Sequence, residues 1–417
     1  MKRSTRVWLG LGLALFVLAA VAAYELIASP FQAMLLADYA RRLTFQSESG
    51  PSDRIRYPKA GPYDIRYGYA RLPDFRPRLE ARDFLIARQA RLSPEMDKLA
   101  DYSLFLPYRE KTSAGLTLDD CAGQPYFSFR QPRRVYAGFD AIPPMVANTL
   151  LFIENRELLD PNHPQRNPAV EWDRLAQAVL EKAVQVVQPG RNVPGGSTLA
   201  TQIEKYRHSP NGLTLTAGDK LRQMASASVR AYLDGTDTRV TRRRIVLDYL
   251  NTVPLAAAPG FGEVHGLGDA LQAWFGLDFE QVNALLREPA QTAAAARAYK
   301  HVLGLLIAQR KPSWYLLGGR KQLDALANVH LGLLAEAGVI TPAFSGLARH
   351  QHIDFQTGRP KGSPRMANKA AVAARIELSR MLGVPLLYDL DRLERFRRIA
   401  HPEYQWWDRV CDARKLG

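Results

Sequence analysis

A short polar stretch between Val193 and Lys205 has residue types and a spacing that could bind a substrate. It reads VPGGSTLATQIEK, so two glycines and two hydroxyl residues come directly before a predicted helix. In that helix Thr198, Gln202 and Lys205 recur at the spacing of one helical face. Leucine, isoleucine and tyrosine side chains form a second face, which is apolar. We expect the apolar face to pack inward, so that a hydroxyl, an amide and an ammonium group point in one direction.

The turn before this helix has two interpretations. Ser197 or Thr198 could cap the helix and satisfy its first N–H groups. Alternatively, a helix start that is approached through glycines can bind an anion such as phosphate. Gly190 and Gly195 have the spacing of a nucleotide phosphate-binding loop, but Gly196 stands where that loop needs lysine. A nucleotide site is therefore not expected, whereas a cap and an anion site both stay open.

The bulk composition leaves room for several domains and indicates an acidic partner. The chain has 417 residues, of which 47% are hydrophobic and 23% are charged, as in ordinary globular proteins. Its net charge of +15 favours a nucleic acid, an anionic membrane or a phosphate-bearing substrate. Solvated surface residues can carry much of such a charge, so it ranks these partners without selecting one.

The N-terminus narrows this choice. Lys2, Arg3 and Arg6 precede an uncharged run from Val7 to Tyr24, close to the roughly 20 residues that cross a bilayer. The basic flank places the N-terminus in the cytoplasm. A cleaved signal peptide is the alternative, because Ala20-Val21-Ala22 would suit its cleavage site, but the apolar run exceeds the usual core of about 7–15 residues. We therefore favour a retained anchor. In either case the rest of the chain lies outside the cytoplasm, which argues against DNA, RNA and ATP.

Cysteine and histidine give no indication of a metal site. The two cysteines, Cys121 and Cys411, could form a disulfide in an exported protein or remain unpaired thiols. The eight histidines form no H-E-x-x-H motif or similar cluster. We expect no metal ion bound by the protein alone.

The elements that must position the polar stretch are mainly helices. Residues from about 47 to 80 are rich in proline, glycine, tyrosine and arginine, which indicates a loop-rich or short-stranded region. Residues 126–139 have a strand-like pattern. Beyond the proline pair that follows, helical patterns dominate. Helices are predicted over residues 145–158, 169–187, 217–233 and 241–251, besides the one that begins near Thr198.

Four segments stand in an order that resembles a known enzyme family. Residues 153–158 read IENREL, 194–206 read PGGSTLATQIEKY, 220–227 read KLRQMASA and 245–251 read IVLDYLN. They are similar to the E-D-R-x-F, Q-G-G-S-T-x-x-Q-Q-x-x-K-N, K-x-x-E-x-x-x-A and I-L-x-x-Y-L-N motifs of family 51. These peptidoglycan glycosyltransferases occur as monofunctional transglycosylases and in class A penicillin-binding proteins. The resemblance covers roughly residues 135 to 340 and the anchor.

The resemblance implies a fold, a reaction and a set of roles. The fold would be mainly α, with a lysozyme-like glycosyltransferase domain, an N-terminal transmembrane helix and a small loop-rich α+β segment between them. A sugar hydroxyl would attack the anomeric carbon of a lipid-pyrophosphate donor, with Glu154 as the base. Cationic side chains would hold the pyrophosphate charge. The implied substrate-binding residues are Arg156, Gly196, Ser197, Thr198, Gln202, Lys205 and Asn251, and Asn251 is expected to end or brace a helix whether or not it binds substrate.

The resemblance also implies ligands, partners and a location. The substrates would be lipid II and the nascent glycan chain, with Mg²⁺ or another divalent cation assisting the pyrophosphate. Further partners would be the membrane and cell-wall synthesis proteins. A nucleic acid is not expected as a partner. We expect a single-pass protein of the plasma membrane with its main domain in the periplasm. The expected divisions are a cytoplasmic tail at 1–6, the anchor at 7–28, an extracytoplasmic segment at 29–134, the glycosyltransferase-like domain at 135–300 and a helical extension at 301–417.

The sequence departs from the family pattern where catalysis is concerned. Gln223 stands at the position of the second catalytic glutamate, and glutamine keeps the shape of glutamate but loses its charge and proton chemistry. Asn155, Leu158 and Thr201 are further departures. Two functions therefore stay open: a glycosyltransferase that works with Glu154 alone, or a catalytically impaired relative that binds lipid-linked glycan or scaffolds an envelope complex.

Of two other enzyme classes, one is excluded and the other is less well supported. A penicillin-binding transpeptidase is excluded within this chain, because no S-x-x-K motif occurs. A muramidase would also use cleft carboxylates, but cations suited to pyrophosphate favour a synthase.

Overall fold

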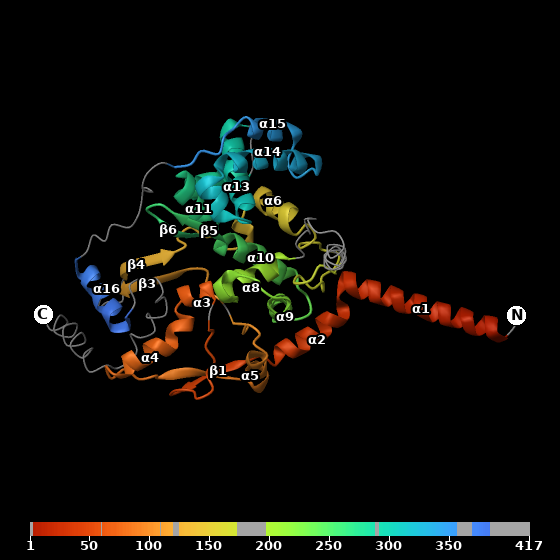
Figure 1. Ribbon diagram of the computed structural model, residues 1–417, viewed down its shortest axis with the longest axis horizontal. Coiled ribbons are helices and arrows are strands. Elements are labelled where there is room, and N and C mark those ends of the chain that lie inside the picture. Colours follow the sequence, from red (N-terminus) through yellow and green to blue (C-terminus); the bar gives the residue numbers. More distant parts are fainter. Residues whose placement is uncertain are drawn as a thin grey trace.

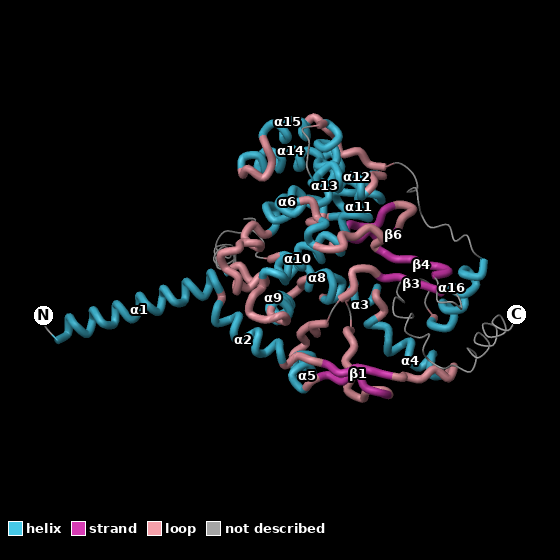
Figure 2. Tube along the Cα trace, turned by 180° about the vertical axis from the view of Figure 1, so that it is seen from behind, coloured by secondary structure: helices cyan, strands magenta, loops and turns pink. Residues whose placement is uncertain are grey.

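The computed structural model describes residues 3–59, 61–108, 110–119, 125–172, 197–287, 292–356 and 369–383. Within these ranges the protein is mainly helical, and its strands form three two-stranded antiparallel sheets. Figures 1 and 2 show a helical body from which one long helix projects. The prediction of a mainly α protein is confirmed.

The projecting helix is α1 (Arg3–Ala28), and α2 (Pro30–Arg41) follows it after a sharp turn (Figure 1). Its segment Leu11–Ala28 is long and apolar enough to cross a membrane, a property that N-terminal signal sequences share. At the turn Ser29 adopts a left-handed conformation with φ of 57°. The carboxylate of Glu25 accepts hydrogen bonds from the first N–H groups of α2 at 2.9 Å, so this contact ties α1 to α2.

The segment between α2 and residue 134 combines short helices with two hairpins. One hairpin lies at the edge of the body, at the bottom of Figure 1, and the other lies beside α16 (Lys369–Leu382). This mixture agrees with the predicted α+β segment. The elements are β1 (Phe45–Ser49), α3 (Pro62–Arg66), η1 (Tyr69–Arg71), α4 (Leu72–Glu80), β2 (Arg88–Leu92), α5 (Pro94–Asp101), β3 (Ala114–Asp119) and β4 (Pro125–Gln131).

The helical body begins near Phe139 and has one continuous hydrophobic core. Short 3₁₀ turns and one small hairpin connect its helices. Its first part consists of η2 (Phe139–Ala141), α6 (Pro144–Glu154), α8 (Leu199–His208), η3 (Pro210–Gly212), α9 (Ala217–Ala231), α10 (Arg239–Thr252), β5 (Pro254–Ala258), β6 (Gly262–His265), α11 (Gly266–Phe275) and α12 (Phe279–Arg287).

The centre of this core is α13 (Ala293–Ala308), a helix that is buried along most of its length. It packs against α6, α11 and α12 on the one hand, and against α14 (Arg320–Glu336) and α15 (Pro342–Arg349) on the other. The short helix η4 (Trp314–Gly318) leads into α14. Described residues from Tyr136 to Ile353 contribute to this one core, so residues on both sides of the predicted division at 300 belong to one packed unit.

Candidate active site

The carboxylate of Glu154 lies where α6 ends. Apolar residues of α6 pack into the core, and Asn155 leaves the helical conformation, with φ of −160°. Glu154 is only 8% exposed. Its Oε2 accepts a hydrogen bond from Gln202 Nε2 at 2.8 Å. Its Oε1 accepts from Gln309 Nε2 at 2.8 Å and from Arg310 Nη2 at 3.2 Å. The predicted base is therefore oriented by side chains from distant parts of the chain.

The start of α8 is capped by Thr198. The threonine hydroxyl accepts from Thr201 N at 3.3 Å and lies 3.3 Å from the carbonyl oxygen of Ala169, to which it can donate. Thr198 is almost completely buried. The capping interpretation of the turn therefore fits Thr198. Gly196, which sequence patterns placed in the cleft, lies outside the described residues.

The polar face of α8 reaches Glu154 through Gln202. This glutamine donates to Glu154 and accepts a hydrogen bond from the hydroxyl of Tyr249 at 3.2 Å, so its amide is fixed in orientation. Lys205 lies about one turn further along the same face. It is half-buried, and its ammonium group makes no hydrogen bond or ion pair with any residue that the structure describes. The predicted juxtaposition of the acid with this face of α8 is present.

A second lysine joins this face from α9. Lys220 Nζ donates to the hydroxyl of Ser197 at 2.7 Å, so Ser197 contacts a cation instead of capping the helix. Burial and the nearby charge of Lys205 lower the pKa of Lys220 to about 8. Two cations that repel each other in a partly buried place favour the binding of an anion. Lys220 opens the third motif, but sequence patterns did not indicate it as a site residue.

Gln223 lies one turn after Lys220 and is 1% exposed. Its amide nitrogen donates to the hydroxyl of Ser209 at 2.9 Å, and its amide oxygen contacts the hydroxyl of Thr214 at 3.1 Å. The side chain is therefore held among neutral hydroxyl groups. At this position the chain offers hydrogen bonds and no titratable group.

The two remaining predicted residues lie apart from this arrangement. Arg156 is exposed, and its guanidinium stacks on the ring of Phe152 at 4.0 Å from the centroid. Asn251 is buried, and its amide forms two hydrogen bonds with the backbone of Tyr136, at 2.8 and 2.9 Å. Asn251 thus braces the chain that leads into α6, which is the second role that the sequence left open for it.

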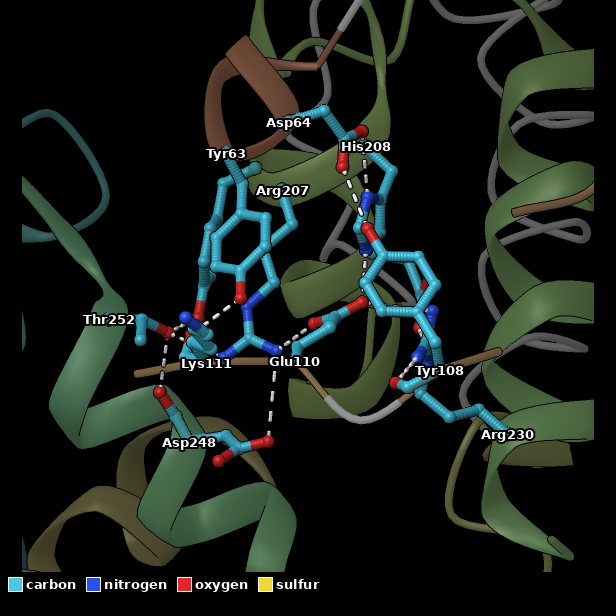
Figure 3. A network of polar contacts seen from close by, with 12 residues as sticks. Tyr63, Asp64, Tyr108, Glu110, Lys111, Arg207, His208, Arg230, Asp248 and Thr252 are labelled. Atoms are coloured by element: carbon cyan, nitrogen blue, oxygen red, sulfur yellow. Dashed lines mark hydrogen bonds and ion pairs between the residues drawn. The ribbon is translucent and has the colours of Figure 1, made fainter. Parts of the chain in front are cut away.

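A buried group of charged residues, which we call the ionic cluster, joins the N-terminal segment to the last turn of α8 (Figure 3). Glu110 forms ion pairs with Arg207, with His208 Nε2 at 2.6 Å and with Arg230 Nη2 at 3.1 Å. Asp64 of α3 contacts His208 Nδ1 at 2.9 Å. These five residues define the cluster. Because its partners are far apart in the chain, no local sequence pattern indicated it.

Glu110 and His208, at the centre of the ionic cluster, are both charged at neutral pH. Burial alone would lower the pKa of His208, but the charge of Glu110 and the hydrogen bonds to Asp64 and Glu110 raise it to about 10. Burial would likewise raise the pKa of the Glu110 carboxyl, but Arg230, His208 and Arg207 hold it well below its usual range. The N-terminal segment is thus tied electrostatically to the helix that carries Gln202 and Lys205.

No group of three or more histidine, cysteine, aspartate or glutamate side chains suited to a metal ion occurs in the described part of the chain. Cys121 and Cys411 lie outside that part. Ser197, Lys205 and Lys220 form a cationic end of the site.

Comparison with known protein families identifies a domain in the middle of the chain. Residues 122–301 match the model of the transglycosylase family. No curated protein matches the chain. The matched residues include Glu154, the described start of α8 and Gln223, whereas Gln309 and Arg310 lie beyond them. Residues 122–301 therefore form a transglycosylase domain with the lysozyme-like fold, the peptidoglycan glycosyltransferase module of family 51.

Proposed function

We propose that the protein polymerises lipid II into glycan strands and releases lipid pyrophosphate. The family implies this substrate and product. The observation that carries the proposal is the contact of the Glu154 carboxylate with Gln202, on the face of α8 that also bears Lys205. A base and a cationic end thus share one site, and the transfer of a sugar from a pyrophosphate donor needs both.

In the proposed reaction the hydroxyl oxygen of the acceptor sugar attacks the anomeric carbon of the donor sugar. The bond from this carbon to the pyrophosphate oxygen breaks, and its electron pair stays on the pyrophosphate. Glu154 takes the proton of the attacking hydroxyl, a role that contributes roughly 10²- to 10⁴-fold in rate. Lys205 and Lys220 form no ion pair with a carboxylate in the described part of the chain and would balance the charge that grows on the leaving group.

The neutral side chain of Gln223 is compatible with this reaction. A pyrophosphate can leave as an anion when cations hold it, so this step needs no second acid to protonate it. Gln223 contributes hydrogen bonds that fix Ser209 and Thr214. The proposed mechanism therefore places all proton transfer on Glu154.

A divalent cation, which the family resemblance implies, does not fit the described residues as a protein-held ion. Mg²⁺ prefers carboxylate and water oxygens, whereas this end of the site presents two lysines and one serine hydroxyl. No step of the proposed mechanism runs through a metal ion.

The lipid tail of the substrate requires the site to lie at a membrane. The family acts outside the cytoplasm, and α1 is an apolar helix at the N-terminus. We propose that α1 is retained as a single-pass anchor with its N-terminus in the cytoplasm. Its link to α2 through Glu25 would keep the helical body close to the extracytoplasmic surface of the membrane that α1 crosses.

The test is the polymerisation of labelled lipid II by the purified full-length protein, with glycan strands resolved on a gel. Glu154→Gln keeps the shape of the side chain, and we expect it to lower the rate by about 10²- to 10⁴-fold. Glu157→Gln is the matched control, since this exposed carboxylate three residues later pairs with Arg166 and should leave the rate unchanged. Equal rates for both variants and the wild type would refute the role of Glu154.

One observation favours a second function, that of a catalytically impaired relative that binds lipid-linked glycan or scaffolds an envelope complex. Gln223 is an amide whose nitrogen and oxygen are both hydrogen-bonded to hydroxyl groups. This function predicts that the wild-type protein binds lipid II without forming polymer and that Gln223→Glu brings no gain. Polymer formed by the wild type would exclude it.

A further inference from the structure

Two residues that follow α13 reach the carboxylate of Glu154 although they lie outside the matched domain of residues 122–301. Gln309 Nε2 donates to Glu154 Oε1 at 2.8 Å. Arg310 donates to the same oxygen from Nε at 3.3 Å and from Nη2 at 3.2 Å. The candidate base thus has donors from the part of the chain beyond the family match.

The backbone holds these two residues in place. Gln309 N donates to Leu305 O and Arg310 N to Ile307 O, which continues the last turn of α13. Since α13 is the buried centre of the core, its end cannot shift without disturbing that core. Gln202 holds the other carboxylate oxygen from α8. The carboxylate is therefore fixed between two helices, and each of its oxygens has its own amide donor.

Arg310 brings a positive charge to Glu154. Its Nη2 forms an ion pair with Glu154 Oε1 at 3.2 Å. Tyr249 of α10 donates to Gln202, and the charge of Glu154 acts on this tyrosine. Burial, followed by the charge of Glu154, raises the pKa of Tyr249 well above its ordinary value, so this tyrosine stays neutral. Arg310 therefore contacts the base as a cation, whereas Tyr249 reaches it through Gln202.

We propose that Gln309 and Arg310 are positioning residues for Glu154. Gln309 fixes the direction of the carboxylate through an uncharged amide, and Arg310 holds the same oxygen through an ion pair. This inference rests on the proposed function and extends the active site beyond the transglycosylase domain. Because the side chain of Arg310 is 55% exposed, solvent screens its charge, and we expect the removal of this arginine to have a modest effect on the rate.

The first test compares kcat and KM for polymerisation by the full-length protein. Arg310→Ala should lower kcat by about 10-fold and leave KM unchanged, because a misdirected base slows the reaction without weakening substrate binding. Arg310→Lys should restore most of the loss. Arg297→Ala is the matched control, because Arg297 lies on α13 but pairs with Asp354. Its kcat and KM should equal those of the wild type.

Gln309→Ala tests the uncharged donor. It should lower kcat by about 10- to 100-fold and leave KM unchanged. A raised KM with an unchanged kcat in Arg310→Ala would mean that Arg310 binds substrate, and it would overturn the inference. So would a loss of kcat of the same size in the Arg297→Ala control.

A second measurement does not depend on activity. Thermal unfolding of the full-length wild type, Arg310→Ala, Glu154→Gln and the double variant forms a double-mutant cycle. We expect Arg310→Ala to lower the Tm less in the Glu154→Gln background than in the wild type. Equal losses in both backgrounds would contradict the contact. The cycle could show coupling although neither the wild type nor any variant forms polymer at any pH. In that case the contact between Arg310 and Glu154 stands, whereas the proposed function fails. The proposed role of Arg310 as a positioning residue in catalysis then fails with it.

Discussion

Replacing Glu110 with glutamine removes the negative charge that three buried cations of the ionic cluster share. Glu110 pairs with Arg207, His208 and Arg230, and its side chain is only 5% exposed. Glutamine keeps the length of the side chain, so the substitution mainly removes charge. The loss of one partner from a buried ion pair costs about 3–5 kcal/mol, because the other partner stays buried without compensation.

The expected cost lies at the lower end of this range because each cation keeps another carboxylate. Arg207 lies 3.7 Å from Asp248, and Arg230 lies 2.7 Å from Glu204. His208 keeps Asp64 at 2.9 Å. We therefore expect Glu110→Gln to lower the free energy of unfolding by about 3 kcal/mol.

The assay is denaturant unfolding of the full-length protein in detergent at pH 7, followed by its helical signal. Asp101→Asn is the control, since Asp101 is 61% exposed and pairs with the exposed Arg56. Such surface pairs contribute about 1 kcal/mol or less. A loss for Glu110→Gln as small as that of the control would refute the reasoning, because the three cations would then not depend on the shared charge.

Three further predictions concern charge and surface. The pKa of Lys220 is lowered to about 8, so Lys220 loses its charge and the polymerisation rate should fall as the pH rises above about 8. Lys220→Arg stays charged, and its pH–rate profile should therefore fall only at higher pH. The pKa of His208 is raised to about 10 in the folded protein, against about 6.5 in the unfolded chain. The stability that protonated His208 contributes is therefore complete below about pH 6.5 and is lost as the pH rises from about 6.5 to about 10. Unfolding of His208→Gln measured over this pH range should not show this loss of stability. Leu215 and Leu221 are 75% and 66% exposed beside Lys220, and replacing both with serine should weaken binding of the protein to lipid vesicles, whereas an unchanged affinity would show that they do not touch the membrane.

The sequence predicted the parts of the site that local periodicity determines. Gln202 and Lys205 share a face of α8 because their spacing puts them there, and the order of motifs placed Glu154 opposite that face. The predicted helix over residues 145–158 ends earlier, at Glu154. Asn155 leaves the helix there, and its side chain bonds to Glu171, a contact that no periodic pattern announces.

Long-range contacts explain what the sequence could not predict. Gln309 and Arg310 lie more than 150 residues from Glu154, and only the packing of α13 brings them together. Lys220 reaches Ser197 because α9 folds back along α8. The helix predicted over residues 169–187 lies largely outside the described residues, and so does the glycine pair.

The continuity of the core through α13 has a practical consequence for anyone who builds chimeras from this protein. A graft cut at residue 301, where the family match stops, would sever α13 halfway and discard α14 and α15, which cover it. A family match shows which residues share a common sequence pattern, whereas the folding unit is determined by which apolar surfaces pack against each other. A transplantable piece of this chain therefore has to extend at least to Ile353, which is the last buried residue of that core in the described part of the chain.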